Sequence, residues 1–216
     1  MAATMEKAPE KAADKAEGAL NRIDARPIDL LTSRRSVLAA QLIEPGPDPE
    51  ALQTMLEAAV RVPDHGRLMP WRLQVVGKTA QAELGELFVR EFARDEPEAK
   101  EERLQLERVR PQRSPVLVIV SSKIERDHAI PEVEQLLSCG NVCMNLLHAA
   151  TAMGFGAQWV TNWPAYNPVV KAVLGIPQDE HLVGFIHIGT PKSPPSERAR
   201  PDLDDVVRFL PTLPPG

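Results

Sequence analysis

The stretch VLVIVSSK, residues 116–123, decides the fold of this 216-residue chain. Its first five residues are all apolar, and four of them are β-branched. A strand with one face in water alternates apolar and polar residues, whereas this run offers no polar face. The stretch therefore predicts a central strand that is buried on both faces of its sheet.

Further strand candidates stand on both sides of this stretch. Residues 72–78, 156–161 and 181–190 combine β-branched or aromatic residues with flanking turn residues. VVRF, residues 206–209, is a candidate for one more strand near the C-terminus. We therefore expect about four or five strands.

The predicted helices interleave irregularly with these strands. One begins at the N-cap candidate Asp48 and ends at Pro63, and a short one runs from Asn167 to Gly175. The charged segment 82–110, broken at Pro97, is expected on the exposed surface. Residues 131–153 are apolar nearly all round, as in a helix buried in a core or a subunit interface. This irregular order predicts an α+β fold rather than a regular βαβ array.

Composition and charge exclude several classes of function. The net charge of −5 and the pI near 5.6 argue against nucleic-acid binding, which needs a basic stripe. No apolar run is long enough to span a bilayer, so no membrane partner is expected. Cys139 and Cys143 are expected to be buried thiols, and the five scattered histidines show no metal-ligand spacing.

The N-terminal segment differs from the rest of the chain. Residues 1–25 are rich in Ala, Glu and Lys, with no apolar stripe and too many charges for a signal peptide. We expect a mobile extension there, a single domain over residues 26–216, and a cytoplasmic location.

The triplet Arg34-Arg35-Ser36 is a first candidate binding site. It follows an apolar helical turn, and two guanidinium groups with a hydroxyl suit a phosphate. The alternative is a solvated basic patch.

The stretch VPDHGRLMPWRL, residues 62–73, is a second candidate. Three side chains, those of Arg61, Asp64 and His65, can form hydrogen bonds with a heteroaromatic ring. Pro70 and Trp71 can form a wall beside it. A histidine in a turn is more often structural.

The stretch WVTNW, residues 159–163, is a third candidate. It holds two of the three tryptophans at a predicted strand end, and core packing explains one of them more easily than two. A ligand or a partner subunit would cover the second.

Four motifs in this order resemble the FMN-dependent nitroreductase family, in particular its small bacterial members with a PDH motif. They are SRRS at residues 33–36, the PDHGRLMPW stretch, GFGAQWVT at residues 154–161 and VGFIHIGTP at residues 183–191. The resemblance covers residues 27–210. Met69 stands where the family commonly has Gln, so the match there rests on Pro70 and Trp71.

The resemblance implies a homodimer with a mostly antiparallel sheet and FMN at the subunit interface. Arg34, Arg35 and Ser36 would hold the flavin phosphate and ribityl chain, while Arg61 and His65 would reach the flavin from the other subunit. The C-terminal segment would reach toward the partner. The remaining implied flavin contacts are Pro70 and Trp71 on one side of the cleft, Trp159, Val160 and Thr161 beside the ring, and Arg200, or as second choice Arg198, at the phosphate.

The implied activity is NAD(P)H-dependent reduction of an electron-poor small molecule, such as a nitroaromatic or a quinone, by a ping-pong mechanism in which the flavin carries the chemistry. NADPH and NADH both remain open as electron donors. Three alternatives also stay open: a related flavin enzyme of different chemistry, a flavin-binding module without turnover, and an interaction protein without cofactor.

Overall fold

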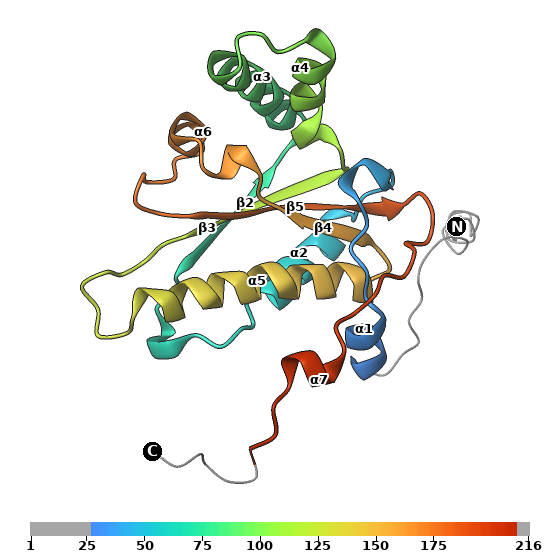
Figure 1. Cartoon of the computed structure of the whole chain (residues 1–216), viewed down its shortest axis with the longest axis vertical. Helices are drawn as coiled ribbons and strands as arrows, with labels where there is room; N and C mark the ends of the chain where they lie inside the picture. The colour runs from blue at the N-terminus through green and yellow to red at the C-terminus, as the bar shows by residue number, and fades with distance from the viewer. Residues whose placement is uncertain (1–26, 211–216) are drawn as a thin grey trace, which may run out of the picture.

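A sheet of five antiparallel strands lies at the centre of the computed structural model, which describes residues 27–210 (Figure 1). β3 lies between β2 and β5, and β5 also pairs with β4 and, at its C-terminal end, with β1. This arrangement confirms the predicted α+β fold with β3 inside the sheet. The strands are β1 (Leu42–Ile43), β2 (Trp71–Val76), β3 (Val116–Ser122), β4 (Gly156–Val160) and β5 (Leu182–Pro191).

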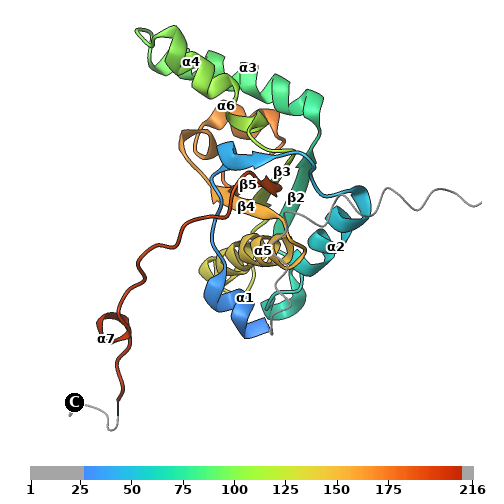
Figure 2. The same ribbon diagram turned by 90° about the vertical axis from the view of Figure 1, so that its right-hand side faces the viewer.

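Helices cover both faces of the sheet (Figures 1 and 2). One face carries α2 and α5, and the other carries α3 and α6, with α4 packed on α3. The short α1 lies near the C-terminal end of α5, and α7 belongs to a segment that extends away from the body. The helices are α1 (Pro27–Ser33), α2 (Pro49–Ala59), α3 (Lys78–Asp95), α4 (Glu101–Arg108), α5 (Glu132–Ala152), α6 (Pro168–Val173) and α7 (Leu203–Val206).

The side chains of β3 divide between the two layers of the core. Val118 and Val120 pack with α2 and α5, whereas Leu117 and Ile119 pack with α3 and α6, and all four are fully buried. This is the physical reason for the unbroken apolar run in the sequence, because both faces of the strand lie in a core.

The capping and helix-breaking residues lie where the sequence predicts them. The Asp48 carboxylate accepts a hydrogen bond from the Ala51 amide, and the Asn167 side chain caps α6 in the same way. The break between α3 and α4 falls around Pro97. The expected exposure of segment 82–110 is wrong for α3, which buries one face against the sheet through an apolar set consisting of Leu84, Leu87 and Phe88.

The predicted strand at VVRF is also wrong. Val206 is the last residue of α7, and residues 207–210 form no strand and are exposed. The segment extends away from the body in Figure 2, so no strand edge lies beside it to accept its backbone hydrogen bonds. The expected N-terminal extension, residues 1–25, lies outside the described residues.

The helix α5 is buried where it faces the sheet. Cys139 and Cys143 are free, fully buried thiols, and desolvation raises the pKa of each to about 12. They are therefore neutral packing residues, as expected from the sequence. None of the helices within residues 27–210 is long and apolar enough to cross a membrane.

Candidate functional site

The Arg34–Ser36 loop is fixed beside β4 by backbone contacts. The Arg34 amide donates to Leu30 and ends α1, and the Val37 amide donates to the carbonyl of Ala157 over 3.0 Å. Two residues further on, the amide of Ala39 donates to Oε1 of Gln158. These bonds bring the predicted phosphate-binding residues next to the strand that carries Trp159.

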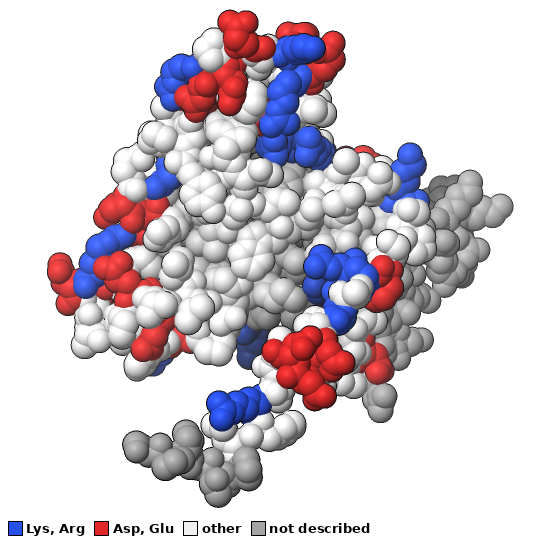
Figure 3. Space-filling view, in the orientation of Figure 1, with Lys and Arg blue, Asp and Glu red and all other residues white. Residues whose placement is uncertain are grey.

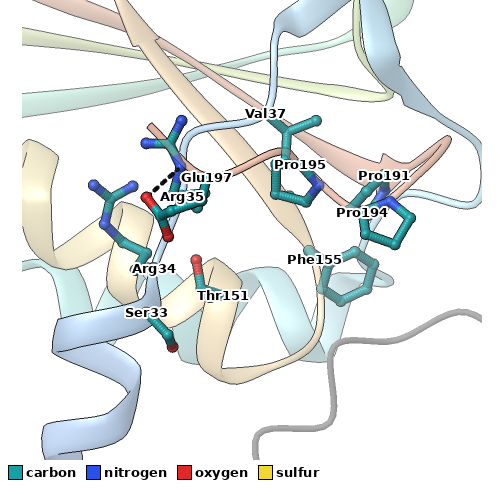
Figure 4. A pocket seen from close by; sticks show the side chains of 11 residues that line it. Ser33, Arg34, Arg35, Val37, Thr151, Phe155, Pro191, Pro194, Pro195 and Glu197 are labelled. Atoms are coloured by element: carbon teal, nitrogen blue, oxygen red, sulfur yellow. Dashed lines mark ion pairs between the residues drawn. The ribbon is translucent and has the colours of Figure 1, made fainter. Parts of the chain in front are cut away.

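The segment that follows β5 crosses this loop (Figure 4). Nε of Arg35 donates to the carbonyl oxygen of Ser196 over 3.0 Å and lies 3.4 Å from Oε1 of Glu197. Nη2 of Arg200 lies 3.5 Å from the same Glu197 oxygen. Both C-terminal arginines named from the sequence therefore lie near the loop, because Arg198 donates its amide to Glu197.

Positively charged side chains lie close enough together at the loop to affect one another's pKa. Desolvation lowers the pKa of Arg34, and the neighbouring charges of Arg200 and Arg35 lower it further. On α5, desolvation and then the charge of Arg34 lower the pKa of His148. Crowded guanidinium groups of this kind form a site for an anion that accepts several hydrogen bonds.

Two cavities adjoin the loop and share Arg35, Val37, Pro194 and Pro195 in their walls. The smaller, about 220 Å³, is the one drawn in Figure 4 and includes Arg34 and Glu197. The larger, about 780 Å³, falls in the size range of small-molecule sites. Its further polar walls come from Ser36, Gln158, Trp159, Ser196 and Arg198.

Trp159 forms one wall of the larger cavity. Its Nε1 donates to the carbonyl of Val183 on β5 over 2.9 Å, and the side chain is 36% exposed. The indole lies over Gly184, where an added Cβ would clash with Nε1. A glycine at position 184 is therefore required for the indole to lie flat on the strand.

The residues after Trp159 have different roles in the structure. Val160 is half-buried against the core on the α3 side of the sheet, and Thr161 is half-buried. Asn162 has φ of 60°, a left-handed conformation that non-glycine residues adopt rarely and often near functional sites.

Trp163 is the one of the two tryptophans that core packing explains. Its ring packs against Phe88 and Phe92, and its Nε1 donates to the buried Glu107 carboxylate over 2.9 Å. Core contacts therefore account for Trp163, and Trp159 alone of this pair faces the cavity.

The residues named in and around the PDH stretch lie in another part of the structure, away from the arginine loop. Nδ1 of His65 lies 2.8 Å from Oε2 of Glu134 on α5, and the side chains of Arg61 and His65 are exposed. The Asp64 carboxylate is occupied, since it accepts from the amides of Leu68 and Met69. Asp64 is thus a turn residue.

Pro70 and Trp71 lead from this turn into the sheet. Pro70 is buried, and its carbonyl accepts from the amide of Lys123 and from Sγ of Cys139. Trp71 begins β2 opposite Ser122 and is half-buried against the α5 core. Both residues therefore have structural contacts within the chain.

The predicted site residues are spread along α5, with His65 near its N-terminal end and the arginine cavity near its C-terminal end. Glu134, next to His65, and Thr151, in the wall of the arginine cavity, lie about 26 Å apart along the helix axis, given the α-helical rise. Arg61 and Trp159 lie between these two ends, because the carbonyl of Arg61 accepts from Nδ2 of Asn145 over 3.1 Å and the indole of Trp159 lies near Gly140.

Three residues at these places were not identified from the sequence. Gln158 holds the backbone of the arginine loop, Glu197 lies on Arg35, and Glu134 pairs with His65. Gln158 precedes a predicted site residue, which is a usable signal. Glu197 likewise directly precedes the candidate Arg198, whereas Glu134 carries no such signal because its partner His65 is remote in sequence.

The fold and the site together define an α+β protein with an arginine-rich loop beside a cavity of about 780 Å³. The family model described as the nitroreductase family matches residues 31–190, and the chain belongs to this family. The chain is 34% identical over 167 residues, 76% of its length and 88% of the relative's, to the Escherichia coli K12 protein named "Putative NAD(P)H nitroreductase YdjA".

Solved structures share the same fold. A nitroreductase-like family protein from Bacillus cereus superposes with a TM-score of 0.74 at 20% identity, over 87% of this chain and 97% of that one. A nitroreductase from Bacteroides fragilis, solved with bound FMN, gives a TM-score of 0.63 at 20% identity, over 86% of this chain and 99% of that one. At these identities the likeness shows the fold.

Proposed function

We propose that this chain is an FMN-dependent oxidoreductase that uses NADPH or NADH to reduce electron-poor small molecules such as nitroaromatics or quinones. The observation that carries the proposal is the arginine loop, with Trp159 and the basic C-terminal segment around one cavity. The relatives support it, since one is named for NAD(P)H and another was solved with FMN.

The donor set at the loop fits the phosphate of FMN. Arg34, Arg35 and the hydroxyl of Ser36 would hold the phosphate and ribityl chain, with Arg200 or Arg198 as a further cation. Trp159, Val160 and Thr161 would lie beside the ring. FMN, when bound, supplies the redox chemistry by taking a hydride from NAD(P)H and passing the electrons to the acceptor, so no side chain has to act as a nucleophile. The donor and the acceptor would occupy the pocket in turn.

A homodimer would complete the site. Because His65 lies beside Glu134, at the far end of α5 from the arginine cavity, we propose that Arg61 and His65 of the partner subunit, with Pro70 and Trp71 behind them, close the flavin cleft. The surface supports a partner: Figure 3 shows a broad uncharged face beside basic atoms near the C-terminal segment. Large apolar side chains remain exposed on α5 and on the C-terminal segment, which would reach toward the partner: Val133, Leu137, Leu203, Val206 and Phe209.

The first experiment is flavin retention. The purified protein is incubated with FMN and desalted, and the bound flavin is quantified by absorption. We expect one FMN per subunit in the wild type and a clear loss in Arg35→Ala, with Glu50→Ala, an exposed residue of α2, as the control. A wild-type protein that retains no FMN would contradict the proposal.

The second experiment tests whether each site is shared between subunits. Arg35→Ala and His65→Ala would each weaken both sites of a homodimer. In a hybrid dimer of the two variants, a shared arrangement places both defects in one site and leaves the other intact, so half of the FMN binding returns. If both residues served the site of their own subunit, the hybrid would show no recovery. A cytoplasmic location stays a prediction from the sequence.

A further inference from the structure

Glu197 lies on the arginine cluster proposed for the phosphate. Its Oε1 is 3.4 Å from Nε of Arg35 and 3.5 Å from Nη2 of Arg200, and Figure 4 shows its side chain directed toward Arg34 and Arg35. The amide of Arg198 donates to the same oxygen over 2.8 Å. One carboxylate thus forms ion pairs with two of the guanidinium groups that a phosphate would use.

The Glu197 carboxylate is stabilised in its charged form. A hydrogen bond from the Arg198 amide lowers the pKa of this carboxyl, desolvation opposes that shift, and the charges of Arg200 and Arg35 add to the lowering, so that the net shift is downward. Glu197 is therefore an anion at neutral pH, and it partly neutralises the cluster.

The segment that carries Glu197 is weakly attached. Residues 193–200 form no helix or strand, and most of them are exposed. The contacts that hold their centre to the loop are those of Arg35 with Ser196 and Glu197. Few buried contacts are lost when such a segment moves, so its displacement requires little free energy.

A phosphate monoester carries a charge between about −1.5 and −2 at neutral pH and binds guanidinium groups as a carboxylate does. It cannot share the cluster with Glu197 without repulsion between the two anions. We propose that Glu197 is a built-in competitor for the phosphate site, which occupies the arginines in the cofactor-free chain and is displaced when a phosphorylated ligand binds. This inference rests on the proposed FMN binding and adds a residue that sets its strength.

The test compares ligands with and without a phosphate. Dissociation constants for FMN and for riboflavin are measured by flavin fluorescence with the full-length wild type, Glu197→Gln and Glu44→Gln. Glu44 is a matched control, because it is an exposed glutamate in one ion pair, with Lys78 at 3.4 Å, outside both cavities.

We expect Glu197→Gln to bind FMN roughly threefold to tenfold more tightly, since it removes both the competing ion pair and the repulsion. Riboflavin affinity should stay unchanged, and Glu44→Gln should resemble the wild type with both ligands. If Glu197→Gln binds FMN equally or more weakly while the wild type binds it, Glu197 supports the arginines, and the inference is overturned although the proposed function stands.

A second experiment tests the role of Glu197 in the absence of flavin. Binding of inorganic phosphate to the flavin-free protein is followed by ³¹P NMR in the wild type and in Glu197→Gln. Tighter phosphate binding by the variant, in a protein that binds no flavin, would support the competitor and contradict the proposed function. No phosphate or FMN binding by either protein would overturn both.

Discussion

Replacing Glu107 by alanine tests the contacts that join α4 to Trp163, shortly after the end of β4. The Glu107 side chain has no exposed surface, and its carboxylate accepts two hydrogen bonds from Arg110, at 2.7 and 2.8 Å. It also accepts one from Trp163 and lies 3.0 Å from Arg103. Trp163 follows directly on Asn162, so these contacts help to fix the end of β4.

The expected loss follows from what the substitution leaves behind. Arg110 is only 14% exposed, and without Glu107 its guanidinium would lose its buried partner. Removing one member of a buried pair costs roughly 3–5 kcal/mol, and the partial exposure of the arginines favours about 3. For a chain of this size the melting temperature should fall by roughly 6–12 °C.

The assay is thermal and urea unfolding, with Glu101→Ala as the control. Glu101 also pairs with an arginine of α4, Arg108 at 3.5 Å, but its side chain is 75% exposed. We expect the control to change the free energy of unfolding by less than about 1 kcal/mol. Equal effects of the two substitutions would refute the reasoning.

The pH dependence gives a second readout of the same pair. Burial raises the pKa of the Glu107 carboxyl, but the hydrogen bonds from Arg110 and Trp163 and the nearby arginine charges outweigh burial and hold it below its ordinary value of 4.5. The stabilisation is therefore present above pH 4.5 and is lost as the pH falls through the lowered pKa. The difference between wild type and Glu107→Ala should shrink in acid, and a constant difference would contradict this.

Further substitutions test other parts of the account. Gly184→Ala forces the indole of Trp159 away from Val183, so we expect a loss of about 1 kcal/mol in urea unfolding and a change in tryptophan fluorescence; an unchanged spectrum would contradict the placement of the indole. Arg35→Ala should weaken FMN binding by roughly tenfold to a hundredfold and leave riboflavin binding nearly unchanged in fluorescence titrations, whereas equal losses would place Arg35 away from the phosphate. Leu146→Ala, at a fully buried position, should lower the free energy of unfolding by about 2–5 kcal/mol. A smaller loss would contradict the tight packing around Leu146, because it would mean that neighbouring side chains fill the space that the leucine leaves.

Much of the fold could be predicted because its signals are local. The side chain of Asp48 caps α2 by accepting from an amide only three residues away. The burial of β3 could be predicted from the apolar residues of the strand itself. The failure at residues 206–209 has the opposite cause. A strand needs a neighbour to pair with, and β-branched residues alone do not supply one.

The candidate site could be predicted only in part for the same reason. Arg34 to Ser36 and Trp159 form recognisable motifs, but the contact between Arg35 and Ser196 joins residues 161 positions apart. The burial of Trp163 likewise depends on Phe88 and Glu107, which lie far away in the sequence. Such contacts follow from how the elements pack, which a single sequence does not specify.

The most direct test of the central claim is the anaerobic reduction of bound flavin. The FMN-reconstituted and desalted protein is mixed with NADPH and, separately, with NADH, while the flavin absorption band is followed. The account predicts that the band bleaches with at least one donor and returns when a quinone or a nitroaromatic is added. A band that persists with both donors would contradict the oxidoreductase and leave a flavin-binding protein without turnover.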